Sequence, residues 1–394
     1  MVDQHRTAGF QPPLCVLRAS FVSLCFSFFT TKAQRESQRP QRGAAALLLA
    51  ASLLSACATI VPEPAPRWSL VVHGGAGVIE RANLTPELEN QYRAAMARAL
   101  ATGGHILENG GASLDAVEAV IREMEDDPLF NAGRGAVFTA DGRNELDASI
   151  MDGRTRAAGA VAGVTTIRHP ISAARAVMER SRHVMLIGEG AEAFARAQGL
   201  EQVDPAYFFT ERRWRALEEN LRRNNLPIPQ RPRGAPPAPR AENILVPDDH
   251  EFGTVGVVAY DSQGNIAVGT STGGTTGKRW GRVGDTPVIG AGTYAQNGVC
   301  GVSATGTGEF FIRVGVARDI CARMEFNRWS AQRAADAVIA EVGAMTGNDG
   351  AFGDGGVIVM DGRGRVAWSF NTSGMYRAAV AADGVPVIEI FRDE

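Results

Sequence analysis

The chain contains 394 residues, of which 45% are hydrophobic and 21% are charged, and its formal net charge at pH 7 is −3. These values are typical of a globular protein and exclude a mainly disordered chain, a collagen-like repeat and a polytopic membrane protein. They give no reason to expect a nucleic-acid-binding protein, which usually carries a strong basic excess.

Residues 39–57 have the layout of a secretory signal, with two arginines, an apolar stretch and small residues before Cys57. The apolar stretch is too short to cross a bilayer as a permanent helix. Leu54-Ser55-Ala56-Cys57 resembles the lipobox of bacterial lipoproteins, in which the cysteine is diacylated and anchors the protein on a membrane. Because Ala58 and not Asp follows, the resemblance predicts an outer-membrane lipoprotein that faces the periplasm. A cleaved signal without a lipid is the alternative.

Residues 1–57 are therefore predicted to be a leader that is not part of the fold. A mis-assigned start codon explains residues 1–38, and a double signal is the alternative. Residues 58–66 contain three prolines and are predicted to be a tether.

The five cysteines are odd in number and show no CxxC spacing, which argues against a disulfide framework and against a cysteine-based zinc site. Cys300 and Cys321 lie in apolar stretches. We expect both to be buried as small hydrophobic side chains.

The segment from residue 67 to 253 mixes strand and helix patterns. An apolar run at 69–72 predicts a strand that enters a tight turn at His73-Gly-Gly-Ala-Gly77. The sequence predicts three helices and two further strands: helices over 85–108, from Ser113 as an N-cap, and from Pro170, and strands over 145–151 and 157–167. Residues 224–247 are rich in proline and are predicted to be a flexible linker.

The segment from residue 254 to 394 begins with a predicted β-hairpin, 254–261 paired with 266–270. Two helices and three more strands are expected after it: helices at 310–325 and 331–345, and strands at 356–360, 365–370 and 375–380. Strands and helices that occur in blocks indicate layers of helix on sheet.

Three familiar kinds of site are excluded. Gly269-Thr-Ser271-Thr-Gly273 matches the GxSxG elbow of the α/β-hydrolases, but that fold needs a histidine after the serine, and the last histidine is His250. The chain has no HExxH motif, which argues against a zinc hydrolase of that type. It has neither GxGxxG nor GxxxxGK[ST], so a nucleotide site has no support.

Gly253-Thr254 stands where the proline-rich segment meets a hydrophobic strand. If the bond between them were cut, the hydroxyl of Thr254 would lie beside its own α-amine, whose pKa of about 7.7–8.0 leaves part of it neutral near pH 7. A threonine activated by its own amine is a nucleophile that needs no histidine. An ordinary strand threonine is the alternative.

The surrounding motifs favour the nucleophile. They are His73-Gly-Gly-Ala-Gly77, Phe130-Asn-Ala-Gly-Arg-Gly135, Gly253-Thr-Val-Gly256, Ser271-Thr-Gly-Gly274, Gly281-Arg-Val-Gly-Asp285 and Ala304-Thr-Gly-Thr-Gly-Glu309. With these motifs, residues 68–390 resemble the plant-type L-asparaginase / isoaspartyl peptidase family of N-terminal-nucleophile hydrolases. The resemblance implies an α/β fold, a four-layer αββα sandwich. It also implies self-cleavage into an α subunit (67–253) and a β subunit (254–394), and pairing of two αβ units.

The resemblance also assigns roles to the nucleophile and its neighbours. Thr254 would attack its own preceding carbonyl, release Gly253, and afterwards attack the substrate. Thr272 would support the Thr254 hydroxyl. Thr305 and Gly306 would form the oxyanion hole through a hydroxyl and a backbone N–H.

The substrate residues follow in the same way. Arg282 would bind the α-carboxylate with its planar guanidinium, and Asp285 would bind the α-ammonium. Gly308 would line the pocket. Asparagine and β-aspartyl dipeptides share both charges and a scissile side-chain amide, so attack by Thr254 would yield a β-aspartyl ester that water hydrolyses. Without the family context, Arg282 and Asp285 could instead be a surface ion pair.

No cofactor is expected for catalysis, but the resemblance implies a structural sodium ion. Backbone carbonyls of the loop from Met124 to Arg134 would bind it, with Glu125, Phe130 and Ala132 among the matching positions. Arg134 departs from the pattern, since the family commonly has an apolar residue there.

Two other functions stay open. Glycosylasparaginases share the fold but usually have Asn at the positions of Gly273 and Thr307, and taspase-type proteases lack the aspartate at position 285. An uncut, inactive surface lipoprotein that binds a ligand is the second alternative. The complete set of motif residues argues against it.

Overall fold

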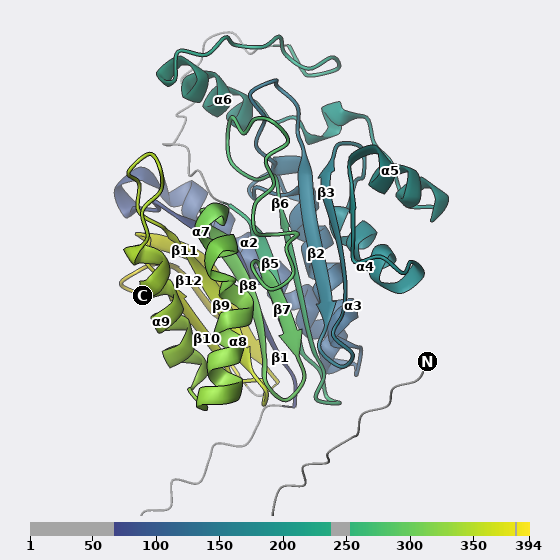
Figure 1. The fold of residues 1–394 in the computed structure, drawn as a ribbon, viewed down its shortest axis with the longest axis vertical. Coiled ribbons are helices and arrows are strands. Elements are labelled where there is room, and N and C mark those ends of the chain that lie inside the picture. The colour runs from purple at the N-terminus through teal and green to yellow at the C-terminus, as the bar shows by residue number, and fades with distance from the viewer. Residues whose placement is uncertain (1–66, 238–252, 383) are drawn as a thin grey trace, which may run out of the picture. The chain divides into compact units, whose positions relative to one another are not determined.

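The computed structural model describes residues 67–237, 253–382 and 384–394. The predicted leader, the tether and the lipidation residue Cys57 lie outside the described residues. The fold consists of two stacked β-sheets with helices on both outer faces, which is the predicted αββα sandwich (Figure 1).

The larger sheet has eight strands in the order β12-β11-β1-β5-β6-β2-β3-β4. Its pairs are antiparallel except β3 with β4. In chain order its strands are β1 (Ser69–Gly77), β2 (Leu146–Asp152), β3 (Ala157–Val164), β4 (Met185–Ile187), β5 (Val255–Tyr260), β6 (Ile266–Thr272), β11 (Gly374–Ala381) and β12 (Val387–Phe391).

The smaller sheet is antiparallel, in the order β10-β9-β8-β7. Its strands are β7 (Thr293–Gln296), β8 (Cys300–Gly306), β9 (Gly355–Asp361) and β10 (Val366–Phe370). It faces the larger sheet through β8 and β9, which contact β1 and β5.

Helices cover the outer face of each sheet. The larger sheet is covered by α2 (Pro86–Glu108), α3 (Ser113–Asp126), α4 (Pro170–Arg180) and α5 (Gly188–Ala197). The smaller sheet is covered by α8 (Val316–Asn327) and α9 (Ala331–Ala344), with α7 (Gly308–Val314) beside them, and α6 (Glu211–Arg223) lies near the loops at one end (Figure 1). No helix in these described ranges is long and apolar enough to cross a membrane.

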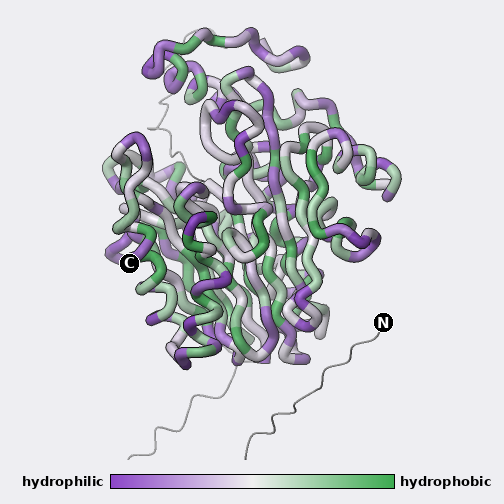
Figure 2. The backbone as a smooth tube through the Cα atoms, in the orientation of Figure 1, coloured by the Kyte–Doolittle hydropathy of each residue, from purple (hydrophilic) through white to green (hydrophobic). Residues whose placement is uncertain are grey.

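The central strands are buried on both faces. In β1, Leu70 and Val72 belong to the core under α2 and α3, while Val71 belongs to the core between the sheets. This explains why β1 and β5 are continuous apolar runs, since both faces of each strand are covered. Along the outer helices, hydrophobic and hydrophilic residues alternate (Figure 2).

Most predicted elements are confirmed, with several differences. The tight turn predicted at His73–Gly77 is wrong, because β1 continues to Gly77 with a bulge between His73 and Gly75. The predicted helix over 310–325 is two helices, because Gly315 adopts a left-handed conformation (φ 68°) between them. Ser113 is the first residue of α3 and not its N-cap. Its N–H is instead bound by the carboxylate of Asp261, at 3.0 Å, so a distant side chain caps the helix. The strands β4, β7, β8 and β12 and the helices α5 and α6 were not predicted.

The first part of the predicted flexible linker packs against the fold. Leu226 and Ala235 contact a small hydrophobic cluster that includes Phe138 and Trp214. Arg231 forms an ion pair with Glu211 at 2.6 Å. The rest of the predicted linker, from residue 238, lies outside the described residues.

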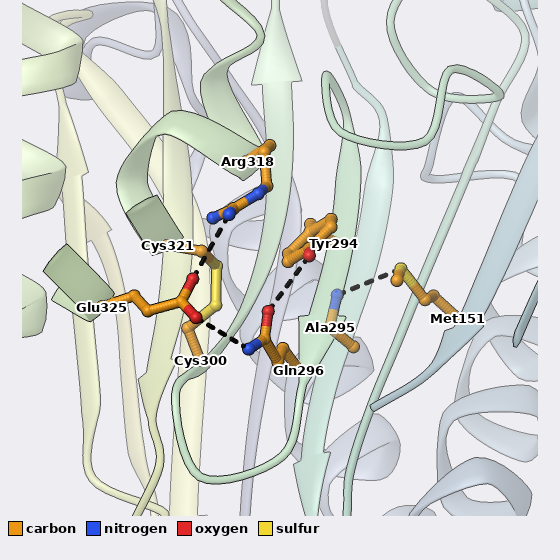
Figure 3. Close-up of a disulfide and its surroundings, with 8 residues drawn as sticks. All are labelled: Met151, Tyr294, Ala295, Gln296, Cys300, Arg318, Cys321 and Glu325. Atoms are coloured by element: carbon orange, nitrogen blue, oxygen red, sulfur yellow. Dashed lines mark hydrogen bonds and ion pairs between the residues drawn. A yellow bond between two sulfur atoms is a disulfide. The ribbon is translucent and has the colours of Figure 1, made fainter. Parts of the chain in front are cut away.

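The prediction that Cys300 and Cys321 are unpaired is wrong, although both are fully buried as expected. They form a disulfide between β8 and α8, with Cα atoms 5.7 Å apart (Figure 3). Beside it, Glu325 accepts hydrogen bonds from Arg318 and Gln296, each at 3.2 Å. The odd cysteine count of the whole chain hides this pair, because the other three cysteines, Cys15, Cys25 and Cys57, lie in the predicted leader.

Replacing both cysteines by alanine should lower the free energy of unfolding by about 3 kcal/mol, because the disulfide closes a short loop in the unfolded chain. Chemical unfolding of the variant and of the wild-type protein, with and without reductant, measures this. Reductant should destabilise the wild type and leave the double variant unchanged. Equal stability of oxidised wild type and variant would contradict the prediction.

Candidate functional site

The pairing of β5 with β6 brings the two predicted threonines together. Val255 lies opposite Ser271, so Thr254 at the start of β5 reaches Thr272 at the end of β6. The Oγ1 of Thr254 donates a hydrogen bond to the Oγ1 of Thr272 at 3.0 Å, and the N–H of Gly274 donates to the same oxygen at 3.0 Å. Both threonines are buried. The structure therefore holds the Thr254 hydroxyl in one place.

The carbonyl that precedes Thr254 is also held. The backbone N–H of Asn131 donates to the Gly253 oxygen at 3.1 Å. Asn131 is itself fixed, because its carbonyl accepts from Gly273 at 3.0 Å and its side-chain amide donates to Gly274 at 2.8 Å. The sequence motif around Asn131 was assigned only to a cation loop, so this contact was missed. The sequence signal that could have revealed this contact was the residue type, since a buried Asn can bind several backbone groups at once.

The predicted oxyanion residues lie at the end of β8, where the smaller sheet meets β1. Thr305 is fully buried, and its Oγ1 accepts a hydrogen bond from Ala76 N–H at 3.4 Å. Gly306 has a φ of 150°, and a Cβ there would overlap the carbonyl of Asp354. The glycine-rich end of β1 and the Thr-Gly-Thr-Gly motif thus adjoin, and Gly306 can only be glycine.

Arg282 and Asp285 are not a surface ion pair. Asp285 is 5% exposed, and a Cβ on Gly308 would lie 2.9 Å from its Oδ1. Arg282 instead forms a bidentate pair with Glu309, with Nε–Oε1 at 2.9 Å and Nη2–Oε2 at 2.8 Å. Glu309 directly follows the Thr-Gly-Thr-Gly motif, and its role was not predicted. The pairing leaves the Nη1 edge of Arg282 unused by Glu309.

The two carboxyl groups near Arg282, those of Asp285 and Glu309, have pKa values that are shifted in opposite directions. Burial raises the pKa of Asp285 to about 7, and the nearby charge of Arg282 opposes this shift. The Oδ2 of Asp285 has no hydrogen-bond partner. Arg282 holds the pKa of Glu309 below its ordinary value. A buried carboxylate oxygen without a partner beside an arginine suits a ligand that carries both a positive and a negative charge.

His73 lies between the sheets behind the threonines. Its Nε2 is 2.8 Å from the Ser303 hydroxyl. Burial lowers its pKa to about 3, against a hydrogen bond with the backbone of Thr254. His73 is therefore neutral near pH 7 and a weak base.

The predicted cation loop is compact and rich in carbonyl oxygens. A Cβ on Gly133 would overlap the carbonyl of Glu125, and one on Gly135 would overlap that of Phe130. The Glu125 side chain points elsewhere: its Oε1 accepts from Ser271 at 2.6 Å and from Ile171 N–H at 3.0 Å, and burial raises its pKa to about 8. Arg134 is exposed. In the described part of the chain, no three acidic, histidine or cysteine side chains cluster as metal ligands.

Comparison with known proteins agrees with this geometry. A family model described as asparaginase matches residues 66–390. An isoaspartyl peptidase of Escherichia coli (strain K12) is 46% identical over 325 residues, which cover 82% of this chain and 96% of the relative. A probable isoaspartyl peptidase/L-asparaginase 2 of Arabidopsis thaliana is 42% identical (82% of this chain, 99% of the relative). A plant-type L-asparaginase of Pyrococcus abyssi is 41% identical (78% and 94%). Extensive identity and a family match over most of the chain show that this protein is a hydrolase that belongs to the asparaginase family.

Proposed function

We propose that this protein cuts its own chain between Gly253 and Thr254, and then hydrolyses the side-chain amide of L-asparagine and of β-aspartyl dipeptides. The observation that carries the proposal is the fixed geometry at Thr254, whose hydroxyl is held by Thr272 while the preceding carbonyl is held by Asn131. The names of the relatives, isoaspartyl peptidase and plant-type L-asparaginase, support the choice of substrates.

The self-cleavage step uses groups that are already in place. The Oγ1 of Thr254 attacks the carbonyl carbon of Gly253, and the Asn131 N–H stabilises the negative charge that develops on the oxygen. The C–N bond breaks, the amine takes the proton of the hydroxyl, and an ester joins Gly253 to Thr254. Water hydrolyses the ester and leaves Thr254 with a free α-amine.

That α-amine is the general base of the substrate reaction. His73 is too weak a base to replace it, because burial lowers its pKa to about 3. The amine takes the proton of the Thr254 hydroxyl as the hydroxyl attacks the side-chain amide, and passes it to the departing ammonia or amino acid. Water then releases aspartate from the β-aspartyl ester.

The substrate binds through its two charges. The α-carboxylate docks on the Nη1 edge of Arg282, which Glu309 leaves open, and the α-ammonium docks on the unpaired Oδ2 of Asp285. The Thr305 hydroxyl keeps its own proton to donate, because it only accepts from Ala76 N–H. Together with the Gly306 N–H it binds the oxyanion.

We also propose that the mature protein works outside the cytoplasm. The buried Cys300–Cys321 disulfide supports this location, because disulfides persist in oxidising compartments. Lipid attachment at Cys57, an outer-membrane location and the pairing of two αβ units stay predictions.

The loop from Met124 to Arg134 suits a sodium ion, which would hold the loop in shape. Hard cations prefer oxygen ligands, and the glycines at 133 and 135 let the carbonyls of Glu125 and Phe130 approach closely. Met124, Ala132 and Arg134 would add backbone carbonyls. The Glu125 carboxyl, which is bound to Ser271, would take no part.

Replacing Thr254 by Ala should leave one uncut chain without amidase activity, because nucleophile and base are both lost. Intact mass under denaturing conditions would show a single polypeptide, while the wild type yields a fragment that begins at Thr254. Thr254→Ser, which keeps a hydroxyl, should still be cut. Cleavage of the alanine variant at this bond would refute the mechanism.

The value of kcat/KM for L-asparagine should fall about tenfold per pH unit below about pH 8, as the Thr254 amine is protonated, and about a hundredfold per pH unit below about pH 7, as Asp285 is protonated as well. The reason is that Asp285 binds the ammonium only when ionised, and burial raises its pKa to about 7. In Asp285→Asn, activity should be low and only the tenfold slope of the Thr254 amine should remain below pH 7. A wild-type profile that stays level into the acid range would contradict the assignment.

Sodium should stabilise the fold through the carbonyl loop. The melting temperature should be higher in sodium chloride than in choline chloride at equal ionic strength. Gly133→Ala should remove the difference, because the added Cβ would overlap the carbonyl of Glu125. Equal melting temperatures of the wild type in both salts would argue against the ion.

A further inference from the structure

Lysine is almost absent from this protein. Of its 40 Lys and Arg residues, only Lys32 and Lys278 are lysine, and Lys278 is the one that the structure describes. Lys278 lies in the loop between β6 and Arg282, and its side chain is 1% exposed. A fully buried ammonium in a chain that uses arginine almost everywhere sets this position apart from the other cations of the protein.

Two groups hold the Lys278 ammonium. Its Nζ donates to the carbonyl of Glu145 at 2.9 Å and lies 3.9 Å from Oδ2 of Asp147, which is completely buried. Asp147 is the register partner of Thr272 in the neighbouring strand, and its Oδ1 accepts from Gly163 N–H at 2.8 Å. Burial lowers the pKa of Lys278, and Asp147 opposes this shift.

The ammonium faces the substrate side of the loop. A Cβ on Gly274 would lie 3.0 Å from Nζ of Lys278 and 3.3 Å from Nη1 of Arg282, so these two nitrogens approach the same point. Nη1 is the edge of Arg282 that Glu309 leaves open. Gly274 also donates its N–H to Thr272. Lys278 therefore lies next to the proposed carboxylate subsite and next to Gly274, which binds Thr272, the residue that supports the nucleophile.

We propose that Lys278 is a positioning residue for the substrate, a second buried positive charge that strengthens binding of the α-carboxylate at Arg282. It acts through its electric field and through its contact with Gly274, and it does not touch the reacting atoms. Glu309 neutralises much of the charge of Arg282. The Lys278 ammonium approaches Gly274 together with Nη1 of Arg282, so it adds attraction for an incoming carboxylate although Asp147 offsets part of its charge. This inference rests on the proposed function.

The test replaces Lys278 by Gln, which can still donate a hydrogen bond to Glu145 but carries no charge. The KM for L-asparagine should rise about tenfold, since one charge a few ångströms away is removed, while kcat changes by less than about threefold. Self-cleavage, read from the intact mass, should be complete, because the precursor step involves no carboxylate substrate. Lys278→Arg keeps the charge and should return KM toward the wild-type value if it is accommodated.

The outcomes separate the possibilities. A Gln variant that is cut, active and unchanged in KM would overturn the inference and leave the proposed function intact. If the Gln and Arg variants both had a lower kcat, incomplete self-cleavage and a lower melting temperature, the role of Lys278 would be purely structural. This result would also overturn the inference. A cut wild-type protein that hydrolyses neither L-asparagine nor β-aspartyl dipeptides would instead refute the proposed function.

Discussion

The antiparallel pairing of β5 with β6 is the constraint on which the rest of the site depends. It places Thr254 against Thr272, and a shift of β5 by one residue would turn the Thr254 side chain to the opposite face of the sheet, away from Thr272. Such a shift is strongly disfavoured, because Val257 and Val258 belong to different cores and would have to exchange them. The burial of two hydrophobic layers thus sets the geometry of a polar contact.

The site is also unusual in how much charge it buries. Asp285, Asp147 and Lys278 are each at most 5% exposed, yet each has an opposite charge nearby. Removing charges from water is costly, and pairing offsets only part of that cost. The fold holds Lys278 beside Asp147 of β2 and buries Asp285 near Gly308. The result is a set of charges that is oriented before a ligand arrives.

Much of this could be predicted from the sequence. The motif residues Thr254, Thr272, Asp285 and Thr305 are local signals. The structure pairs Thr254 with Thr272, places Asp285 beside Gly308 and buries Thr305 at the end of β8. Glu309 and the Cys300–Cys321 pair could not be assigned, because side-chain partners across the fold depend on packing and not on spacing. The break at Gly315 was missed for a related reason, since apolar periodicity continues through a residue that leaves the helical conformation.

The strand order has one more consequence. In the larger sheet, β1 lies between β11 and β5, and β2 lies beside β6, so strands from before and after residue 254 alternate. Once the chain is cut, the two polypeptides are interleaved through three ladders of backbone hydrogen bonds and cannot separate without unfolding. The Cys300–Cys321 disulfide lies within the polypeptide that begins at Thr254, so it does not join the two polypeptides. Folding of the uncut chain is unimolecular, whereas refolding of the cut protein requires two chains to meet. The proposed cleavage would therefore convert a chain that can refold alone into a kinetically trapped one, whose recovery after denaturation would depend on concentration.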